Sequence, residues 1–323
     1  MKNKKYLSLA LACCLLGSIA LAQEKKEMYD ANYIADIFYK LNSDPQDPKR
    51  KINHTKGFCA SGTFEPTANI TNAVDIPLLK QRSIPVEVRY SLGGASMDDK
   101  SKTRGMAIRL QGDKEQWTLV MTNSEILFAK NPEEFVQFLE MRIPVNGKVD
   151  TEKIKKVTQE VDSFRNYANF MNTIGISSLE NTPFYSNHTF WFKTPKQKDL
   201  IPAKWKFIPK DGIKYLDEKE LKNANKDFLT ENFQTYTQAK PIEYDMYLVY
   251  PNKGDATDTP TALWKGKHKE ALVGTLKVQQ YQGMQCNKDV YFPADLPTGV
   301  EAPKDPLFDL RNATYGITFG RRQ

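Results

Sequence analysis

The chain has 323 residues, of which 26% are charged and 40% hydrophobic, with 17 Gly and 18 Pro. This ordinary globular composition excludes a disordered, collagen-like or coiled-coil protein. The formal net charge is +7, and the three histidines, His54, His188 and His268, are far apart in the sequence. A metal centre built from several histidines is therefore not expected.

Residues 1–22 have the pattern of an export signal. Three lysines precede the apolar stretch Tyr6–Ile19, and Ala20-Leu21-Ala22 supplies an A-x-A cleavage site. Cleavage removes three Lys and no acidic residue, so the net charge falls from +7 to +4, which gives no case for a nucleic-acid partner. We expect a periplasmic protein with one domain over residues 23–323. No later apolar run is long enough to cross a membrane.

Two cysteines, Cys59 and Cys286, remain after cleavage. An oxidising compartment permits a disulfide between them, but two cysteines do not make a disulfide scaffold. The sequence leaves both states open, and we expect free buried thiols rather than a bond.

Apolar residues at helical spacing predict an amphipathic helix over 27–42, followed by a Pro- and Lys-rich link at 44–51. Alternating apolar and polar residues then predict strands Ile84–Ser91, Gly105–Leu110 and Gln116–Asn123. Asn131-Pro132 predicts the start of a short helix, with Asn as N-cap. Further helices are expected over 151–172 and 217–238. Further strands are expected at His188–Lys193, Trp205–Ile208, Tyr244–Val249 and Leu272–Tyr281. This order predicts an α+β domain whose antiparallel sheet closes into a β-barrel interrupted by helical insertions.

The C-terminal segment carries the first chemical pattern. Asp305-Pro306 predicts a helix start, and Arg311 and Tyr315, four residues apart, share a face of that helix. A guanidinium beside a phenol favours the phenolate. An anionic tyrosine is one of the few protein ligands for haem iron. The pair alone is more typical of a polar surface pair.

Three further positions are candidates by their context. His54 lies among small residues and glycine, where a packed core histidine is unusual. Asn123 ends an alternating strand, and Arg89 and Ser91 lie on the face of their strand opposite its apolar residues. Each position by itself also fits a structural role.

Taken together and in order, six segments over residues 51–322 resemble the haem catalases. The segment similar to the family's distal-histidine motif is N-H-T-K-G-x-x-A-x-G-x-F. The family's strand that carries an Arg and a Ser is similar to P-V-E-V-R-Y-S in this chain. The family's next strand is similar to T-R-G-M-A-I-R-L. The segment similar to the family's distal-Asn region is W-T-L-V-M-T-N-S-E-I-L-F. The next strand is similar to H-T-F, and the proximal R-x-x-x-Y motif is similar to R-N-A-T-Y. The resemblance is closest to the small catalase-related peroxidases, because the long N-terminal arm and the C-terminal domain of full catalases have no counterpart here.

The resemblance implies a catalase-like fold that binds haem b. It implies that Tyr315 ligates the iron and that Arg311 keeps this tyrosine ionised. It also implies that His54 is the distal acid and base, that Asn123 hydrogen-bonds the peroxide, and that Ser91 orients His54.

The same resemblance implies the contacts of the porphyrin. Arg89 and Arg322 would pair with the haem propionates, and Phe128 would pack near the ring. Lys51 stands where catalases usually have a propionate-binding Arg, and Lys lacks the planar fork of a guanidinium.

Three functions compete. The first is a haem-dependent peroxidase that reduces hydrogen peroxide or organic peroxides with a small organic reductant and has at most weak catalase activity. The second is a peroxide-dismutating catalase or a hydroperoxide isomerase, and the third is a non-catalytic haem-binding protein. Retention of His54 and Asn123 argues against the third, and the absent outer domains favour the first. A homo-oligomer is left open.

Overall fold

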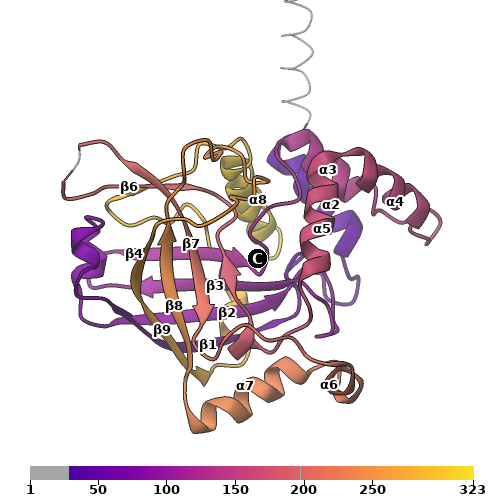
Figure 1. Ribbon diagram of the computed structural model, residues 1–323. Coiled ribbons are helices and arrows are strands. Elements are labelled where there is room, and N and C mark those ends of the chain that lie inside the picture. Colours follow the sequence, from indigo (N-terminus) through magenta and orange to yellow (C-terminus); the bar gives the residue numbers. More distant parts are fainter. Residues whose placement is uncertain (1–28, 197) are drawn as a thin grey trace, which may run out of the picture.

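The computed structural model describes residues 29–196 and 198–323 (Figure 1). The expected export signal and the first two residues of the expected helix over 27–42 lie outside this part of the chain. Within it, no helix combines the length and apolar character needed to cross a membrane.

Eight strands form a closed antiparallel barrel, as the sequence predicted (Figure 1). In chain order they are β1 (Gly57–Pro66), β2 (Ile84–Leu92), β3 (Arg104–Gln111), β4 (Gln116–Thr122), β5 (Phe184–Tyr185), β7 (Ile201–Pro209), β8 (Ile242–Val249) and β9 (Glu270–Tyr281). Pairing of β1 with β9 and of β7 with β8 completes the closure. The short strands β6 (Phe190–Phe192) and β10 (Val300–Glu301) extend from β7 as a separate ribbon.

Side-chain alternation separates the barrel interior from the functional face. On β2, Val86, Val88 and Tyr90 point into the core, so Arg89 and Ser91 lie on the outer face. The interior is filled by large apolar side chains, each of which stabilises the fold by about 1.5–3 kcal/mol when fully buried. The barrel is therefore a packed scaffold, and a ligand site has to lie outside it.

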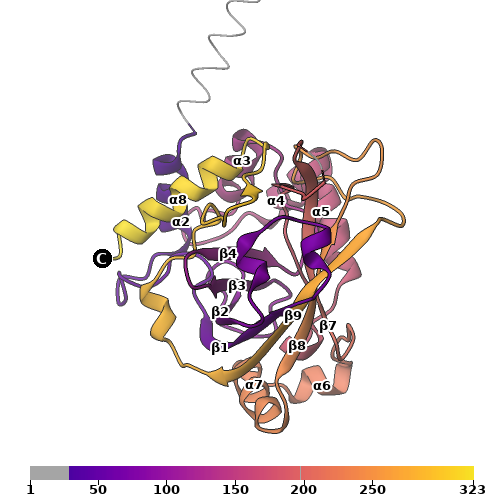
Figure 2. The same cartoon turned by 90° about the vertical axis from the view of Figure 1, so that its left-hand side faces the viewer.

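Helices cover two parts of this barrel (Figure 1; Figure 2). Helices α2 (Ala31–Asn42), α3 (Pro132–Glu140) and α8 (Phe308–Gly320) share one apolar cluster with the segment after β4. Helices α4 (Thr151–Glu160) and α5 (Asp162–Thr173) lie beside them, whereas α6 (Glu218–Asn223) and α7 (Phe228–Ala239) lie at the opposite end of the barrel.

Several predicted boundaries are wrong. The expected helices over 151–172 and 217–238 are each two helices, because Val161 and Ala224 adopt extended backbone conformations. The last helix begins at Phe308 and not at Pro306, because the carboxylate of Asp305 bonds His188 as well as the Leu307 amide. The predicted cap at residue 131 is confirmed by the bond from the Glu134 amide to the Asn side chain.

Cys59 and Cys286 form a disulfide, so the expectation of free thiols is wrong. Cys59 lies on β1 and Cys286 lies in the 3-10 helix η4 (Gln285–Lys288). The chain leaving β9 stays bonded to β1, since Gln282 and Gly283 exchange backbone hydrogen bonds with Cys59. This pairing carries Cys286 to its partner, and no local pattern indicates it.

Candidate active site

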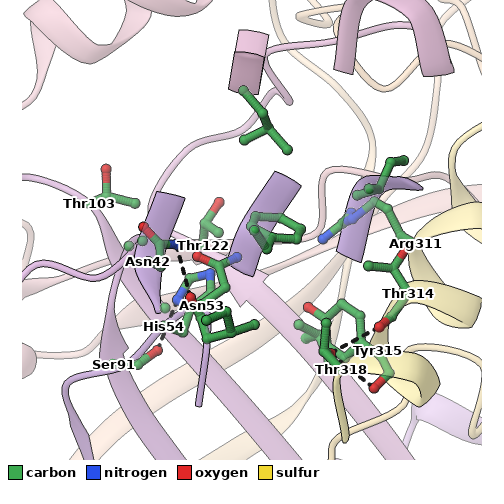
Figure 3. A pocket seen from close by; sticks show the side chains of 18 of the residues that line it. Asn42, Asn53, His54, Ser91, Thr103, Thr122, Arg311, Thr314, Tyr315 and Thr318 are labelled. Atoms are coloured by element: carbon green, nitrogen blue, oxygen red, sulfur yellow. Dashed lines mark hydrogen bonds between the residues drawn. The ribbon is translucent and has the colours of Figure 1, made fainter. Parts of the chain in front are cut away.

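A cavity of about 680 Å³ lies between the outer face of β2–β4 and helices α2, α3 and α8 (Figure 3). Five cationic side chains line it: Lys51, Arg89, Arg142, Arg311 and Arg322. No Asp or Glu of the described chain lines it, and most of the remaining wall is apolar. Because buried charges need partners, this wall fits a largely apolar ligand that carries negative charge.

Helix α8 supplies Tyr315 on one side of the cavity. Its side chain points from the helix toward the space that His54 faces from the other side (Figure 3). Arg311, one turn earlier, lines the same cavity, as the spacing predicted. The hydroxyl of Thr318 bonds the backbone carbonyls of Thr314 and Tyr315 at 2.9 and 3.2 Å.

Arg311 is held by two buried groups that the sequence analysis did not assign to the site. Its Nη1 donates to Nε2 of His188 at 2.5 Å, and Nδ1 of His188 donates to Asp305 at 2.6 Å. A guanidinium can only donate, so His188 is neutral with its proton on Nδ1. Burial lowers the pKa of His188, which agrees with this state. Burial raises the pKa of Asp305, but its hydrogen bonds with His188 and the Leu307 amide, together with nearby positive charge, outweigh burial and the net shift is downward.

His54 and Ser91 meet on the side of the cavity opposite Tyr315. Nδ1 of His54 lies 3.1 Å from Oγ of Ser91, so Nε2 is the ring nitrogen left for a ligand. The backbone of His54 has φ 53°, in the left-handed region, at a cost of about 1–3 kcal/mol. Its carbonyl accepts a hydrogen bond from Arg89 at 2.9 Å, which helps to hold this conformation.

The cavity wall keeps His54 uncharged. Burial, followed by the positive charges of Arg89 and Arg311, lowers the pKa of His54 to about 4. Near neutral pH the imidazole is therefore a proton acceptor, as a base in an acid–base step requires.

One cross-strand row explains how the ring fits. Ser91, Gly105 and Thr122 pair across β2, β3 and β4 and so share one face of the sheet. A Cβ on Gly105 would lie 2.7 Å from Oγ of Ser91 and 2.9 Å from Nδ1 of His54. Glycine thus leaves the space that the imidazole occupies, and Thr122 is the next side chain along the row, lining the cavity.

Asn123 does not reach this site. Its Oδ1 accepts the Arg104 amide at 2.9 Å, and its Nδ2 donates to the Lys102 carbonyl at 2.8 Å, so backbone atoms occupy the side chain. Asn123 follows Thr122, the last residue of β4, and of these two residues only Thr122 lines the cavity. The predicted contact of Asn123 with peroxide is therefore not supported.

Three cations that line the cavity, Lys51, Arg89 and Arg322, bond the segment 287–289. Lys51 Nζ and Arg322 Nη2 donate to the carbonyl of Asp289 at 2.6 and 2.7 Å, and Arg89 Nε donates to Oδ1 of Asn287 at 2.8 Å. Within the described chain none of the three cations forms an ion pair. Burial, then repulsion by Arg89 and Arg322, lowers the pKa of Lys51 to about 7.

The segment that binds these cations is attached to β1 by the disulfide at Cys286. Sequence reasoning missed residues 287–289, and the only signal for them was the second cysteine beside them. Phe128 lines the cavity, as the resemblance implied, and stacks on Phe138 with ring centroids 3.9 Å apart.

These residues fit a metal porphyrin. Tyr315 offers an oxygen ligand, and Lys51, Arg89 and Arg322 offer partners for carboxylates that the protein itself does not supply. The described residues hold no group of three or more His, Cys, Asp or Glu that could bind a free metal ion.

A closed antiparallel barrel that carries a Tyr and a His across a cavity on its outer face defines a catalase-like protein. The family model described as Catalase matches residues 44–322. The chain belongs to the catalase family, whose members generally bind haem and act on peroxide.

Two relatives and two solved structures show the range of the likeness. A catalase-related peroxidase of Synechococcus elongatus is 30% identical over 283 residues, covering 84% of this chain and 83% of its own. A catalase of Schizosaccharomyces pombe is 24% identical over 345 aligned positions, covering 96% and 65%. Catalase A from Saccharomyces cerevisiae superposes with a TM-score of 0.76 at 18% identity, over 84% of this chain and 61% of that one. A fungal catalase superposes with a TM-score of 0.74 at 20% identity, over 86% and 60%. The chain thus spans about three fifths of these solved catalases.

Proposed function

We propose that the protein is a haem b peroxidase that reduces hydrogen peroxide or organic peroxides with small organic electron donors and has at most weak catalase activity. The observation that carries the proposal is the single cavity in which Tyr315, neutral His54 and the cation group of Lys51, Arg89 and Arg322 come together. Tyr315 would hold the haem, which would supply the redox chemistry.

The distal residues handle the proton. His54 accepts a proton from one peroxide oxygen through Nε2 and returns it to the other, so that the O–O bond breaks heterolytically. Ser91 holds the ring by its Nδ1 and keeps Nε2 directed at the cavity. The hydroxyl of Thr122 lines the cavity on the same face of the sheet and donates to the Ser124 carbonyl at 3.3 Å, so it can accept a hydrogen bond from the peroxide in the role expected of Asn123.

On the Tyr315 side of the cavity, Arg311 supplies a positive charge. Arg311 lies one turn before Tyr315, and its bonds to His188, and through it to Asp305, fix its guanidinium. The guanidinium is therefore held at the cavity one helical turn from the tyrosine that would ligate the iron. Arg89, Arg322 and Lys51 would bind the haem carboxylates.

The shape of the cavity favours peroxidation over dismutation. Its lining continues outward to Pro144 and Val149, both exposed at the surface. An opening at this exposed end would admit donors larger than peroxide, and a relative with 30% identity is named a catalase-related peroxidase.

Dismutation is the second candidate, because proteins named catalase match over most of the chain. The two are separated on one preparation, normalised to haem content, by measuring oxygen release from hydrogen peroxide and oxidation of a bulky dye by the same peroxide. We expect slow oxygen release and readily measured dye oxidation, and a large loss of the latter in His54→Ala. Fast oxygen release without dye oxidation would replace the peroxidase by a catalase. A haem-containing protein inert in both assays would be a haem carrier.

We also propose that the protein is exported to the periplasm, which the disulfide supports, since such bonds persist in oxidising compartments. Mass spectrometry of the periplasmic fraction should find a mature N-terminus at Gln23. Full-length protein confined to the cytoplasm would contradict export.

A further inference from the structure

Arg142 is a cavity residue for which the proposed function has no use. It follows α3, and its guanidinium lies over the ring of Phe138, with Cζ 3.5 Å from the ring centroid. Its Nη1 donates to the carbonyl of Phe138. A guanidinium has five N–H donors, so this arrangement fixes its position while leaving donors for a ligand.

The charge of Arg142 has no counter-charge in the described chain. None of the ion pairs within residues 29–196 and 198–323 includes it, and no carboxylate of that part lines the cavity. Burial lowers the pKa of Arg142 to about 10, so the side chain stays protonated at neutral pH. A half-buried cation without a counter-charge is costly, and a bound anion would offset that cost.

This cation is separate from the group that faces the haem carboxylates. Lys51 and Arg322 both bond the carbonyl of Asp289, whereas Arg142 follows α3 and bonds the carbonyl of Phe138. Haem carboxylates bound at Lys51, Arg89 and Arg322 would therefore leave Arg142 without a counter-charge.

The surroundings of Arg142 are apolar. Phe138 and Leu139 precede it on α3, and Pro144 and Val149 follow it at the exposed end of the cavity. Val149 is 42% exposed, so a ligand that reaches Arg142 from outside passes apolar surface. A carboxylate joined to an apolar body matches both features.

We propose that Arg142 is a recognition site for amphipathic monocarboxylates, and that the enzyme's organic peroxide or its electron donor carries such a carboxylate. The inference rests on the proposed function, since both substrates enter this cavity. For a hydroperoxide ROOH, the O–O bond breaks, the donor supplies two electrons, and two protons are taken up to give ROH and water. The apolar body would then lie toward Pro144 and Val149 at the exposed end of the cavity while the carboxylate stays at Arg142.

Binding is tested without turnover, by calorimetric titration of the haem-loaded protein with octanoate and with octan-1-ol. The parent should bind octanoate about tenfold more tightly, which is the effect of about 1.4 kcal/mol that a charge-assisted hydrogen bond supplies. Arg142→Met should lose this preference, and Arg142→Lys should keep part of it. The matched control is Arg165→Met, because Arg165 lies on α5, pairs with Asp162 and does not line the cavity.

Turnover distinguishes the two sources of the carboxylate. With hydroperoxides of equal chain length, with and without a terminal carboxylate, Arg142→Met should lower the ratio of their kcat/KM values about tenfold. If that ratio is unchanged but the corresponding ratio for carboxylated and neutral donors falls, the donor carries the carboxylate.

Equal affinity of the parent for octanoate and octan-1-ol would overturn the proposal, as would an unchanged preference in folded Arg142→Met. The carboxylate preference with no peroxide turnover at all in the parent would instead refute the proposed peroxidase while leaving the binding site in place.

Discussion

Replacing Gly105 by alanine tests how closely the sheet positions His54. The added methyl carbon would lie 2.7 Å from Oγ of Ser91 and 2.9 Å from Nδ1 of His54, where ordinary contacts are about 3.5–4 Å. The imidazole and the hydroxyl therefore have to move by several tenths of an ångström or more, which disrupts their 3.1 Å contact. Misplacement of a reacting group by 1 Å costs about 10²-fold in rate. Gly105→Ala should thus slow the reaction with peroxide by roughly 10²-fold.

The assay is stopped-flow spectroscopy of the haem-loaded protein mixed with hydrogen peroxide, with rates compared at equal haem content. Haem binding should survive, because Tyr315 lies on the other side of the cavity. Gly320→Ala is the matched control, since a Cβ there meets no atom within 4 Å. If Gly105→Ala reacts within threefold of the parent, the position of the His54 ring does not govern the step and the argument fails.

Four further predictions concern the cofactor, pH and the disulfide. Tyr315→Phe should purify with little haem, and an unchanged absorption spectrum would exclude Tyr315 as the ligand. The rate of the peroxide step should be flat above about pH 5 and fall below pH 4, because the imidazole of His54 is protonated as the pH drops through its pKa of about 4; a midpoint near 6.5 in stopped-flow data would contradict this. In the haem-free protein Lys51 has a pKa of about 7, so binding of haem carboxylates above pH 7 has to recruit a proton. Haem affinity, measured by titration, should fall by up to tenfold per unit between pH 7 and 9, and Lys51→Arg should remove this dependence. Changing Cys59 and Cys286 to Ser should lower the free energy of unfolding by about 2–5 kcal/mol in denaturant titrations and should also weaken haem binding. A haem affinity equal to that of the parent would contradict the second expectation.

Local patterns in the sequence determined much of the scaffold and half of the site. Alternation on β2 predicted that Arg89 and Ser91 share the face opposite the core, and the structure places both at the cavity. The four-residue spacing of Arg311 and Tyr315 likewise predicted a common helix face. These results follow from the fixed periods of strand and helix, which depend only on neighbours in the chain.

Tertiary structure decided which residues complete the site. The resemblance of its segment to the distal-Asn region of catalases pointed to Asn123, whereas the pairing of β4 with β3 places Thr122 on the face that lines the cavity. His188 reaches Asp305, and Cys59 reaches Cys286, only because barrel closure and the packing of α8 join segments more than 100 residues apart. The isolated charge of Arg142 is likewise visible only once the walls of the cavity are in place. Such contacts depend on register and closure, which no short window of sequence contains.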